Sequence, residues 1–433
     1  MPTVEPHPIR VVVEDDLSRS RLTVFFRLLL LLPHVVWLYL WAIVAFFAAI
    51  VSWLTTLVLG RPAQPLWRFL AAFVRYATHV YAFGLLAANP SPGFTGKAGS
   101  YPIDLEIDPP GRQNRWKTAF RLLLAVPALW LAGVLLFTVG TGYAYDEQTD
   151  ELYQYSFIFG VSAAVAFLAW FVCLVRGRMP TGFRDLLAFT LRFGAQTWGY
   201  LLFVTDRYPS ADPREPPATQ PTPAKPVNLR VEDDLRRSRL TVFFRLLLTI
   251  PHFVWLVLWG IVVFLALIVA WFVTLVAGRL PDAFHRFFSA YLRYEIHVFA
   301  FLFLVANPFP GFAGAAGSYP VDVEIAPREP QSRWKTLFRI FLAIPAHILN
   351  SALGVPLYLA AFFGWFVGLA LGRMPEGLRN LGAYVLRYSA QFYAYLYLLT
   401  DSYPFTGPAE YVEPEVALEP VPTWPDAPPE PSF

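Results

Sequence analysis

The chain has 433 residues, of which 56% are hydrophobic and only 15% are charged. Two uncharged runs, 35–60 and 253–278, exceed the roughly 20 residues that a helix needs to span a bilayer. This composition excludes an ordinary soluble globular protein and predicts an all-α polytopic integral membrane protein with a few short strands. The net charge of +3 selects no partner by itself.

One module occurs four times along the chain. Each copy holds a short alternating strand, a basic connector, a long apolar stretch broken by proline, a Gly-Arg turn and an amphipathic helix. The turns are Gly60-Arg61, Gly177-Arg178, Gly278-Arg279 and Gly372-Arg373. We call each copy a quarter and each pair of quarters a half.

The repeat sets the expected boundaries. The first membrane half covers 1–209, with quarters at about 9–100 and 101–209, and the second covers 227–406, with quarters at about 227–318 and 319–406. The proline-rich linker 210–226 is expected to be extended. The acidic, proline-rich tail 407–433 is expected to be disordered and is a candidate arm for a protein partner.

Each quarter is expected to open on a short strand. The four are 9–13, 103–107, 229–232 and 321–325, and the second alternates apolar Ile103, Leu105 and Ile107 with acidic Asp104 and Glu106. We expect the four strands to lie on one side of the membrane and to pair into a small sheet.

An arginine followed six residues later by proline begins each apolar stretch, and we expect it to anchor the helix at the headgroups. The pairs are Arg27 and Pro33, Arg121 and Pro127, Arg245 and Pro251, Arg339 and Pro345. The stretch from Arg27 to Arg61 would be about 51 Å long as one helix, too long for one upright crossing. In quarter two, an acidic segment at 143–156 divides the stretch and must reach water.

We therefore predict a proline-kinked helical hairpin in every quarter, with about eight crossings and the Gly-Arg turns back on the starting side. The alternative is one long kinked helix and a spanning second helix per quarter, also eight crossings. The hairpin places the strands, connectors, amphipathic helices and both termini on one basic face. The positive-inside rule makes that face cytoplasmic, which predicts a multi-pass plasma-membrane protein. The high Arg, Ala and Pro content fits a prokaryotic source.

Two positions in each amphipathic helix carry the candidate site. The residues 14 and 18 positions after the turn arginine share one helix face, and they are Arg75 and His79, Arg192 and Gln196, Arg293 and His297, Arg387 and Gln391. We call each such pair the stripe of its helix. The stripes are expected to contact anionic lipid headgroups or, if the four converge, to bind or conduct an anion. Position 28 holds Asn89, Asp206, Asn307 and Asp401, and we assign Asp206 and Asp401 a structural role at the turn.

No nucleotide-binding, metalloprotease, CxxC or hydrolase motif is present, and no carboxylate pair lies inside an apolar helix. We therefore expect no catalytic residues, no metal, no cofactor and no nucleic-acid partner.

Quarters two and four share two longer motifs. Residues 177–182 (GRMPTG) and 372–377 (GRMPEG) are followed by 205–209 (TDRYP) and 400–404 (TDSYP). This combination resembles a prokaryotic membrane family catalogued as a domain of unknown function (number four-three-eight-nine). Quarters one and three depart from it and end in Asn-Pro-x-Pro-Gly-Phe. The resemblance covers nearly the whole chain outside linker and tail, and it implies a membrane location without an activity.

The leading hypothesis from the sequence is a non-enzymatic membrane scaffold whose amphipathic helices engage anionic lipid. The alternative is a transporter or channel for an anionic solute, built from two pseudo-symmetric halves. The oligomeric state does not follow from the sequence.

Overall fold

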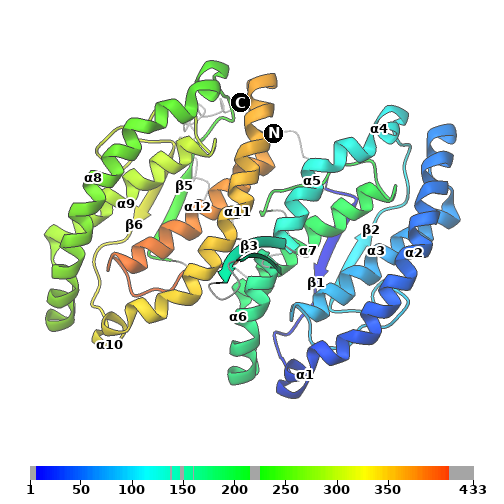
Figure 1. Cartoon of the computed structure of the whole chain (residues 1–433), viewed down its shortest axis with the longest axis horizontal. Helices are drawn as coiled ribbons and strands as arrows, with labels where there is room; N and C mark the ends of the chain where they lie inside the picture. Colours follow the sequence, from blue (N-terminus) through cyan, green and yellow to red (C-terminus); the bar gives the residue numbers. More distant parts are fainter. Residues whose placement is uncertain (1–5, 137–138, 147–150, 159, 215–224, 409–433) are drawn as a thin grey trace, which may run out of the picture.

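The computed structural model describes residues 6–136, 139–146, 151–158, 160–214 and 225–408, and they form a mostly helical chain with three short two-stranded sheets (Figure 1). The long apolar helices are α2 (Arg27–Leu59), α8 (Arg239–Ala277) and α11 (Arg339–Leu371), with α5 (Arg121–Leu136) and α6 (Val161–Arg176) in quarter two. The amphipathic helices are α3 (Gln64–Gly84), α7 (Thr181–Leu201), α9 (Asp282–Leu302) and α12 (Glu376–Leu396). Short helices α1 (Arg21–Phe25), α4 (Arg115–Ala119) and α10 (Arg333–Leu337) precede α2, α5 and α11.

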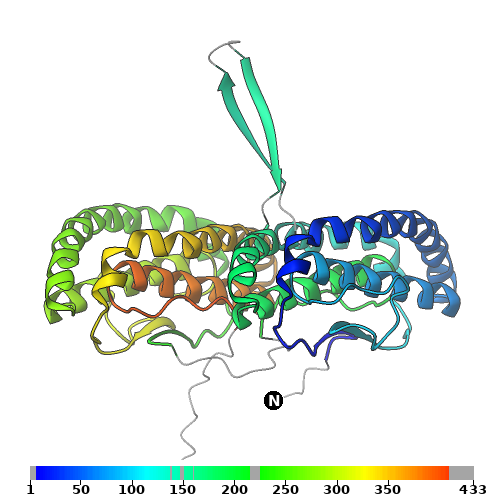
Figure 2. The same cartoon turned by 90° about the horizontal axis from the view of Figure 1, so that it is seen from below.

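The elements form three levels, which are seen best from the side. Figure 2 shows the long helices in the uppermost level, the amphipathic helices beneath them, and the strands β1, β2, β5 and β6 below those. At the outer edges of the molecule α2 and α8 bend towards the strand level. The amphipathic helices therefore have protein on two sides, and α7 and α12 are almost wholly buried.

The strands pair within each half. β1 (Ile9–Val13) is antiparallel to β2 (Ile103–Ile107), and β5 (Val227–Val231) is antiparallel to β6 (Val321–Ile325). The four strands do lie on one side of the molecule, but the prediction that they join one sheet is wrong, because each half closes its own pair. β1, β2 and β6 match the predicted residues, whereas β5 covers 227–231 instead of the predicted 229–232.

The apolar stretches of quarters one, three and four are single continuous helices, so the predicted hairpin is wrong there. Pro33, Pro251, Pro345 and Pro356 lie inside these helices without ending them. Each stretch ends only at its turn glycine, which has φ between 67° and 70°. Glycine adopts this left-handed conformation without the strain that other residues would suffer. Helices α2, α8 and α11 are each long and apolar enough to span a membrane.

Quarter two differs because a β-hairpin interrupts its apolar stretch. β3 (Val139–Asp146) pairs with β4 (Glu151–Ile158), and the hairpin projects from the level of the long helices, away from the other strands (Figure 2). The acidic segment predicted at 143–156 is thus mainly a strand pair, and its residues 147–150 lie outside the described residues.

The linker that was predicted to be extended and the tail that was predicted to be disordered both begin as packed structure. Ala211 in the predicted linker is buried, and Arg387 donates to the carbonyl of Gly407 at 2.6 Å at the start of the predicted tail. The remaining parts of those predictions, residues 215–224 and 409–433, lie outside the described residues.

Candidate functional site

The predicted stripe of quarter one contacts the strand level of its own half. His79 lies 2.7 Å from Asp104 Oδ1, and Arg75 Nε donates to the carbonyl of Leu105 at 3.2 Å. The backbone N–H groups of Gly99 and Leu105 also donate to Asp104. Burial alone would raise the pKa of Asp104, but the hydrogen bonds from His79 and from the two backbone groups lower it below its usual value. The cluster joins α3 to β2 through a buried carboxylate.

Quarter three repeats this cluster with the same geometry. His297 lies 2.8 Å from Asp322 Oδ1, and Arg293 Nε donates to the carbonyl of Val323 at 3.1 Å. The pair is again nearly inaccessible to solvent, with the His297 side chain 1% exposed.

In quarters two and four the stripe binds backbone of other segments. Gln196 donates to the carbonyl of Ile9 at 3.0 Å and accepts from the backbone N–H of Ser210 at 2.9 Å. Gln391 does the same with Val227 and Phe405, both at 2.9 Å. The neighbouring arginines donate to carbonyls of the segments that follow the helices: Arg192 to Asp212, and Arg387 to Gly407.

These contacts correct the predicted role of the stripes. Six of the eight side chains are buried, and Arg75 and Arg293 are only partly exposed, because strands and post-helix segments cover the face that was expected to meet headgroups. The stripes do not line one common site. They attach the strand level to the amphipathic helices.

The arginine that begins each apolar stretch was predicted to anchor the helix at lipid headgroups. In the structure it is buried and contacts the end of an amphipathic helix instead. Arg121 donates from Nη1 to the carbonyls of Tyr200 at 2.8 Å and Thr205 at 3.1 Å. Its Nη2 donates at 2.9 Å to both Gln113 and Asp206. The last carbonyls of a helix have no partner within the helix, and a guanidinium satisfies several of them at once. Arg121 therefore caps the end of α7.

The other three quarters contain the same cap. Each arginine is buried. It binds a carbonyl in the last turn of the amphipathic helix and also the side chain of the residue 28 positions after the turn arginine. The sets are Arg27 with Phe83 and Asn89, Arg245 with Phe301 and Asn307, Arg339 with Tyr395 and Asp401. In quarters two and four the arginine thus pairs with Asp206 or Asp401, a partner that the sequence did not identify.

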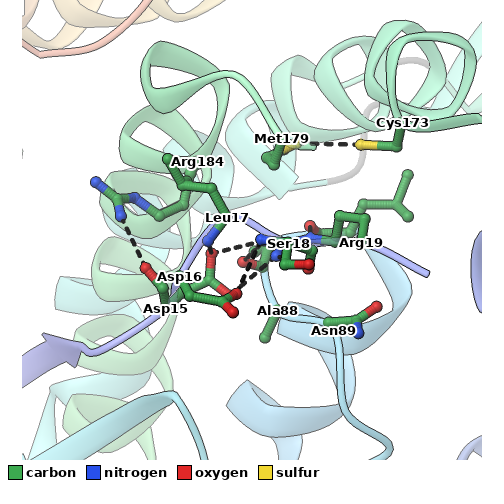
Figure 3. Close-up of polar contacts among 12 residues, drawn as sticks. Asp15, Asp16, Leu17, Ser18, Arg19, Ala88, Asn89, Cys173, Met179 and Arg184 are labelled. Atoms are coloured by element: carbon green, nitrogen blue, oxygen red, sulfur yellow. Dashed lines mark hydrogen bonds and ion pairs between the residues drawn. The ribbon is translucent and has the colours of Figure 1, made fainter. Parts of the chain in front are cut away.

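A residue with positive φ follows the end of each amphipathic helix, although none of the four is glycine. They are Leu86, Phe203, Leu304 and Leu398, with φ between 62° and 66°. Such residues are strained in this conformation, so the surrounding contacts must hold them in place. Arg19 donates to the carbonyl of Leu86 at 2.9 Å and is paired with buried Asp15 at 2.8 Å (Figure 3). In quarter two, Gln113 donates to Phe203 at 2.9 Å.

The two quarters of a half also hold each other's Gly-Arg turns. In the region of Figure 3, the backbone N–H of Arg19 donates to the carbonyl of Gly177 at 2.9 Å, and Met179 donates to Leu17 at 2.8 Å. In return, the N–H of Gln113 donates to the carbonyl of Gly60 at 2.9 Å. The second half repeats both contacts. Each half is therefore one interlocked unit and its quarters are not separate modules.

The second glycine of the GRMPxG motif lies at the contact between the halves. A Cβ on Gly182 would lie 2.7 Å from Thr406 Oγ1, and one on Gly377 would lie 3.2 Å from the backbone N of Asp212. Thus the segment after α12 covers the start of α7, and the segment after α7 covers the start of α12. The motif needs glycine where the two halves exchange these segments.

The exposed surface of the long helices is mainly apolar. Most exposed large apolar side chains belong to the long helices and to the short helices that precede them, including Trp116 and Trp334, which are 76% and 71% exposed. We call this exposed surface of α1, α2, α4, α5, α6, α8, α10 and α11 the apolar face. The turn arginines at its edge are exposed: Arg61, Arg178, Arg279 and Arg373. The turn arginines are therefore exposed, whereas the eight stripe residues are buried or only partly exposed.

Comparison with known proteins gives a family and no activity. A family model described as Domain of unknown function (DUF4389) matches residues 21–95, 154–211, 239–313 and 333–407. The second match is the shortest, and it begins within β4, after the point where the β-hairpin interrupts quarter two. No curated protein and no solved structure matches the chain.

Proposed function

The chain belongs to the DUF4389 family, as its turn motifs predict, and from that premise we propose that it is an integral membrane protein that binds anionic lipid and organises the bilayer around it. The observation that carries this proposal is the separation of exposed side chains by level. Large apolar side chains occupy the apolar face, while the opposite level carries the ion pairs of the strands, such as Arg10 with Asp108 at 2.7 Å.

We infer that the protein lies in one leaflet with its long helices parallel to the membrane plane. In the alternative with upright helices, the strand level would lie beside the middle of α3 and α9. The exposed Glu106 and the partly exposed Arg10 and Asp108 would then face hydrocarbon, where each charged group costs roughly 2.5–3.5 kcal/mol or more. The in-plane arrangement keeps those charges in water and buries the apolar face in acyl chains.

The turn arginines are the proposed headgroup ligands. They follow the ends of the long helices, and α2 and α8 bend towards the strand level at the outer edges of the molecule (Figure 2). Arginine at this depth pairs with phosphate, and the exposed Trp116 and Trp334 suit the same interface. This assignment replaces the buried stripe residues of the first hypothesis.

The hairpin β3–β4 projects from the apolar face. Its strands of eight residues reach about 26 Å, enough to carry the strand ends at Asp146 and Glu151 through the opposite leaflet. Hydrocarbon leaves the backbone groups at the edges of a two-stranded ribbon unpaired at a cost of several kcal/mol each. The proposal therefore also predicts that a second copy covers these edges in the membrane.

The transport alternative depended on arginines lining an anion path. Arg75, Arg192, Arg293 and Arg387 donate to carbonyls of this chain instead, which removes the feature that favoured it. A vesicle assay tests the proposal. The purified chain should co-float with vesicles containing phosphatidylglycerol after a carbonate wash, and release by that wash would contradict it.

A further inference from the structure

The first half contains an apolar cavity of about 710 Å³ between α2, α3, α5 and α7. This volume lies within the range of about 300–1,000 Å³ that is typical of small-molecule sites. Its mouth is lined by Tyr39, Phe46 and Leu122, which are 69%, 62% and 75% exposed, so the cavity opens on the apolar face. Its floor includes Thr78 of α3 and Ala195 of α7, which are buried.

Several positions of this lining carry larger side chains in the second half. The halves align residue by residue along α2 with α8, α3 with α9 and α7 with α12. Lining positions that gain volume in the second half include the pairs Ala45 and Val263, Ala49 and Leu267, Thr78 and Ile296, Leu202 and Tyr397, whereas Tyr39 and Phe203 are replaced by the smaller Val257 and Leu398.

Contacts in the second half show how the space is closed. Tyr397 donates to Glu295 Oε2 at 3.2 Å, and Glu295 replaces Ala77, another lining residue of the first half. The rings of Tyr291 and Tyr397 lie 5.9 Å apart, and a Cβ on Gly260 would lie 2.9 Å from Tyr291 Oη. The first half thus keeps a cavity where the second half has the contacts of Tyr291, Glu295 and Tyr397.

The chemistry of the lining defines the occupant. The surface of the cavity is almost wholly apolar, and its charged member, Arg121, is engaged by Asp206 and by the carbonyls at the end of α7. A headgroup or a soluble anion would therefore lose its hydration without gaining a partner. A hydrocarbon chain would gain burial at roughly 25 cal/mol per Å².

We propose that this cavity binds one acyl chain of a membrane phospholipid, which enters from the apolar face. The inference rests on the proposed function, because only a face that lies in the bilayer brings acyl chains to the cavity mouth. The first half would then hold a lipid, and the second half would be the packed structural counterpart.

The experiment uses the full chain in vesicles of phosphatidylcholine that carries a diazirine within the acyl chain. After irradiation, mass spectrometry maps the labelled residues. The wild-type chain should be labelled at the cavity floor, at Thr78 and Ala195, and on the exposed surface of α8. The equivalent floor positions of the second half, Ile296 and Ala390, should remain unlabelled.

The matched variant transfers the second half's residues into the first: Ala45→Val, Ala49→Leu and Thr78→Ile together. Because the fold already accepts these residues at equivalent positions, the variant is expected to fold. It should lose floor labelling at Ala195 and keep labelling on α8, whereas Ala370→Leu, which adds volume on the exposed surface of α11, should change neither.

The outcomes separate the two proposals. Labelling of α8 with an unlabelled wild-type floor, or floor labelling that survives in the filled variant, would overturn the lipid cavity alone. Absence of label from both α8 and the floor would overturn the membrane placement as well.

Discussion

Arg121 and Asp206 lie 2.9 Å apart and join the start of one helix to the turn that ends another, 85 residues later in the chain. The guanidinium also lies over the ring of Tyr200, 4.7 Å from its centroid. Equivalent arginines in the other quarters make the same connection. The same cap occurs in all four quarters, and it accounts for arginines that the sequence alone attributed to lipid binding.

Replacing Arg121 with Gln should destabilise the protein by about 3 kcal/mol, because Asp206 and the carbonyls at the end of α7 would lose a buried partner. Thermal unfolding in detergent micelles measures this. Arg178→Gln, at an exposed turn position, is the control and should change stability by less than about 0.5 kcal/mol. Equal stability of the two variants would contradict the capping role.

The turn arginines and the stripe arginines should differ in their effect on lipid binding. Replacing Arg61, Arg178, Arg279 and Arg373 with Gln should leave folding intact and weaken binding to vesicles containing phosphatidylglycerol, by roughly 1 kcal/mol for each arginine at low salt. The matched set Arg75, Arg192, Arg293 and Arg387 should instead lower the unfolding temperature. If the buried set reduced lipid binding while folding was unchanged, the headgroup assignment would be wrong.

Buried Glu295 should make the stability of the folded state decrease as the pH rises. Burial raises its pKa from 4.5 to about 7, so the folded state keeps a proton that the unfolded state releases above pH 4.5. Stability should therefore fall as pH rises from about 4.5 to 7, by about 3 kcal/mol, and then level off. Glu295→Gln should abolish this slope in urea titrations at a series of pH values. A slope that is identical in both proteins would assign it to another group.

Gly182→Ala should disturb the contact between the halves, because its Cβ would lie 2.7 Å from Thr406 Oγ1 and 3.0 Å from the backbone N of Gly407. We expect a loss of about 1–3 kcal/mol. Amide hydrogen exchange should increase at 405–407. Gly93→Ala is the control, since nothing lies within 4 Å of that position. Unchanged exchange at 405–407 in Gly182→Ala would exclude the close approach.

The repeat and the turns were predictable because they depend on local sequence. The turn glycines at Gly60 and Gly278 end their helices as expected, since their left-handed backbone disfavours other residues. The strands at 103–107 and 321–325 were also visible from their alternation.

The continuous long helices were not predictable in the same way. An uninterrupted apolar run has no periodicity that separates one long helix from two short ones, and a proline such as Pro33 is compatible with both. The arginine roles were hidden for another reason: Arg121 and Tyr200 are 79 residues apart, and one sequence does not show which segments meet. Arginine near an apolar stretch suits a headgroup or a helix end equally well.

Thiol labelling from each side of the membrane shows whether the long helices lie in the membrane plane, as proposed. In a Cys173→Ser background, single cysteines replace Ala283 at the start of α9, Pro308 just after its end, and Asp146 at the end of β3. A membrane-impermeant maleimide should label Ala283→Cys and Pro308→Cys from the same side and Asp146→Cys from the other. Labelling of Ala283→Cys and Pro308→Cys from opposite sides would mean that α9 crosses the bilayer, which contradicts in-plane helices.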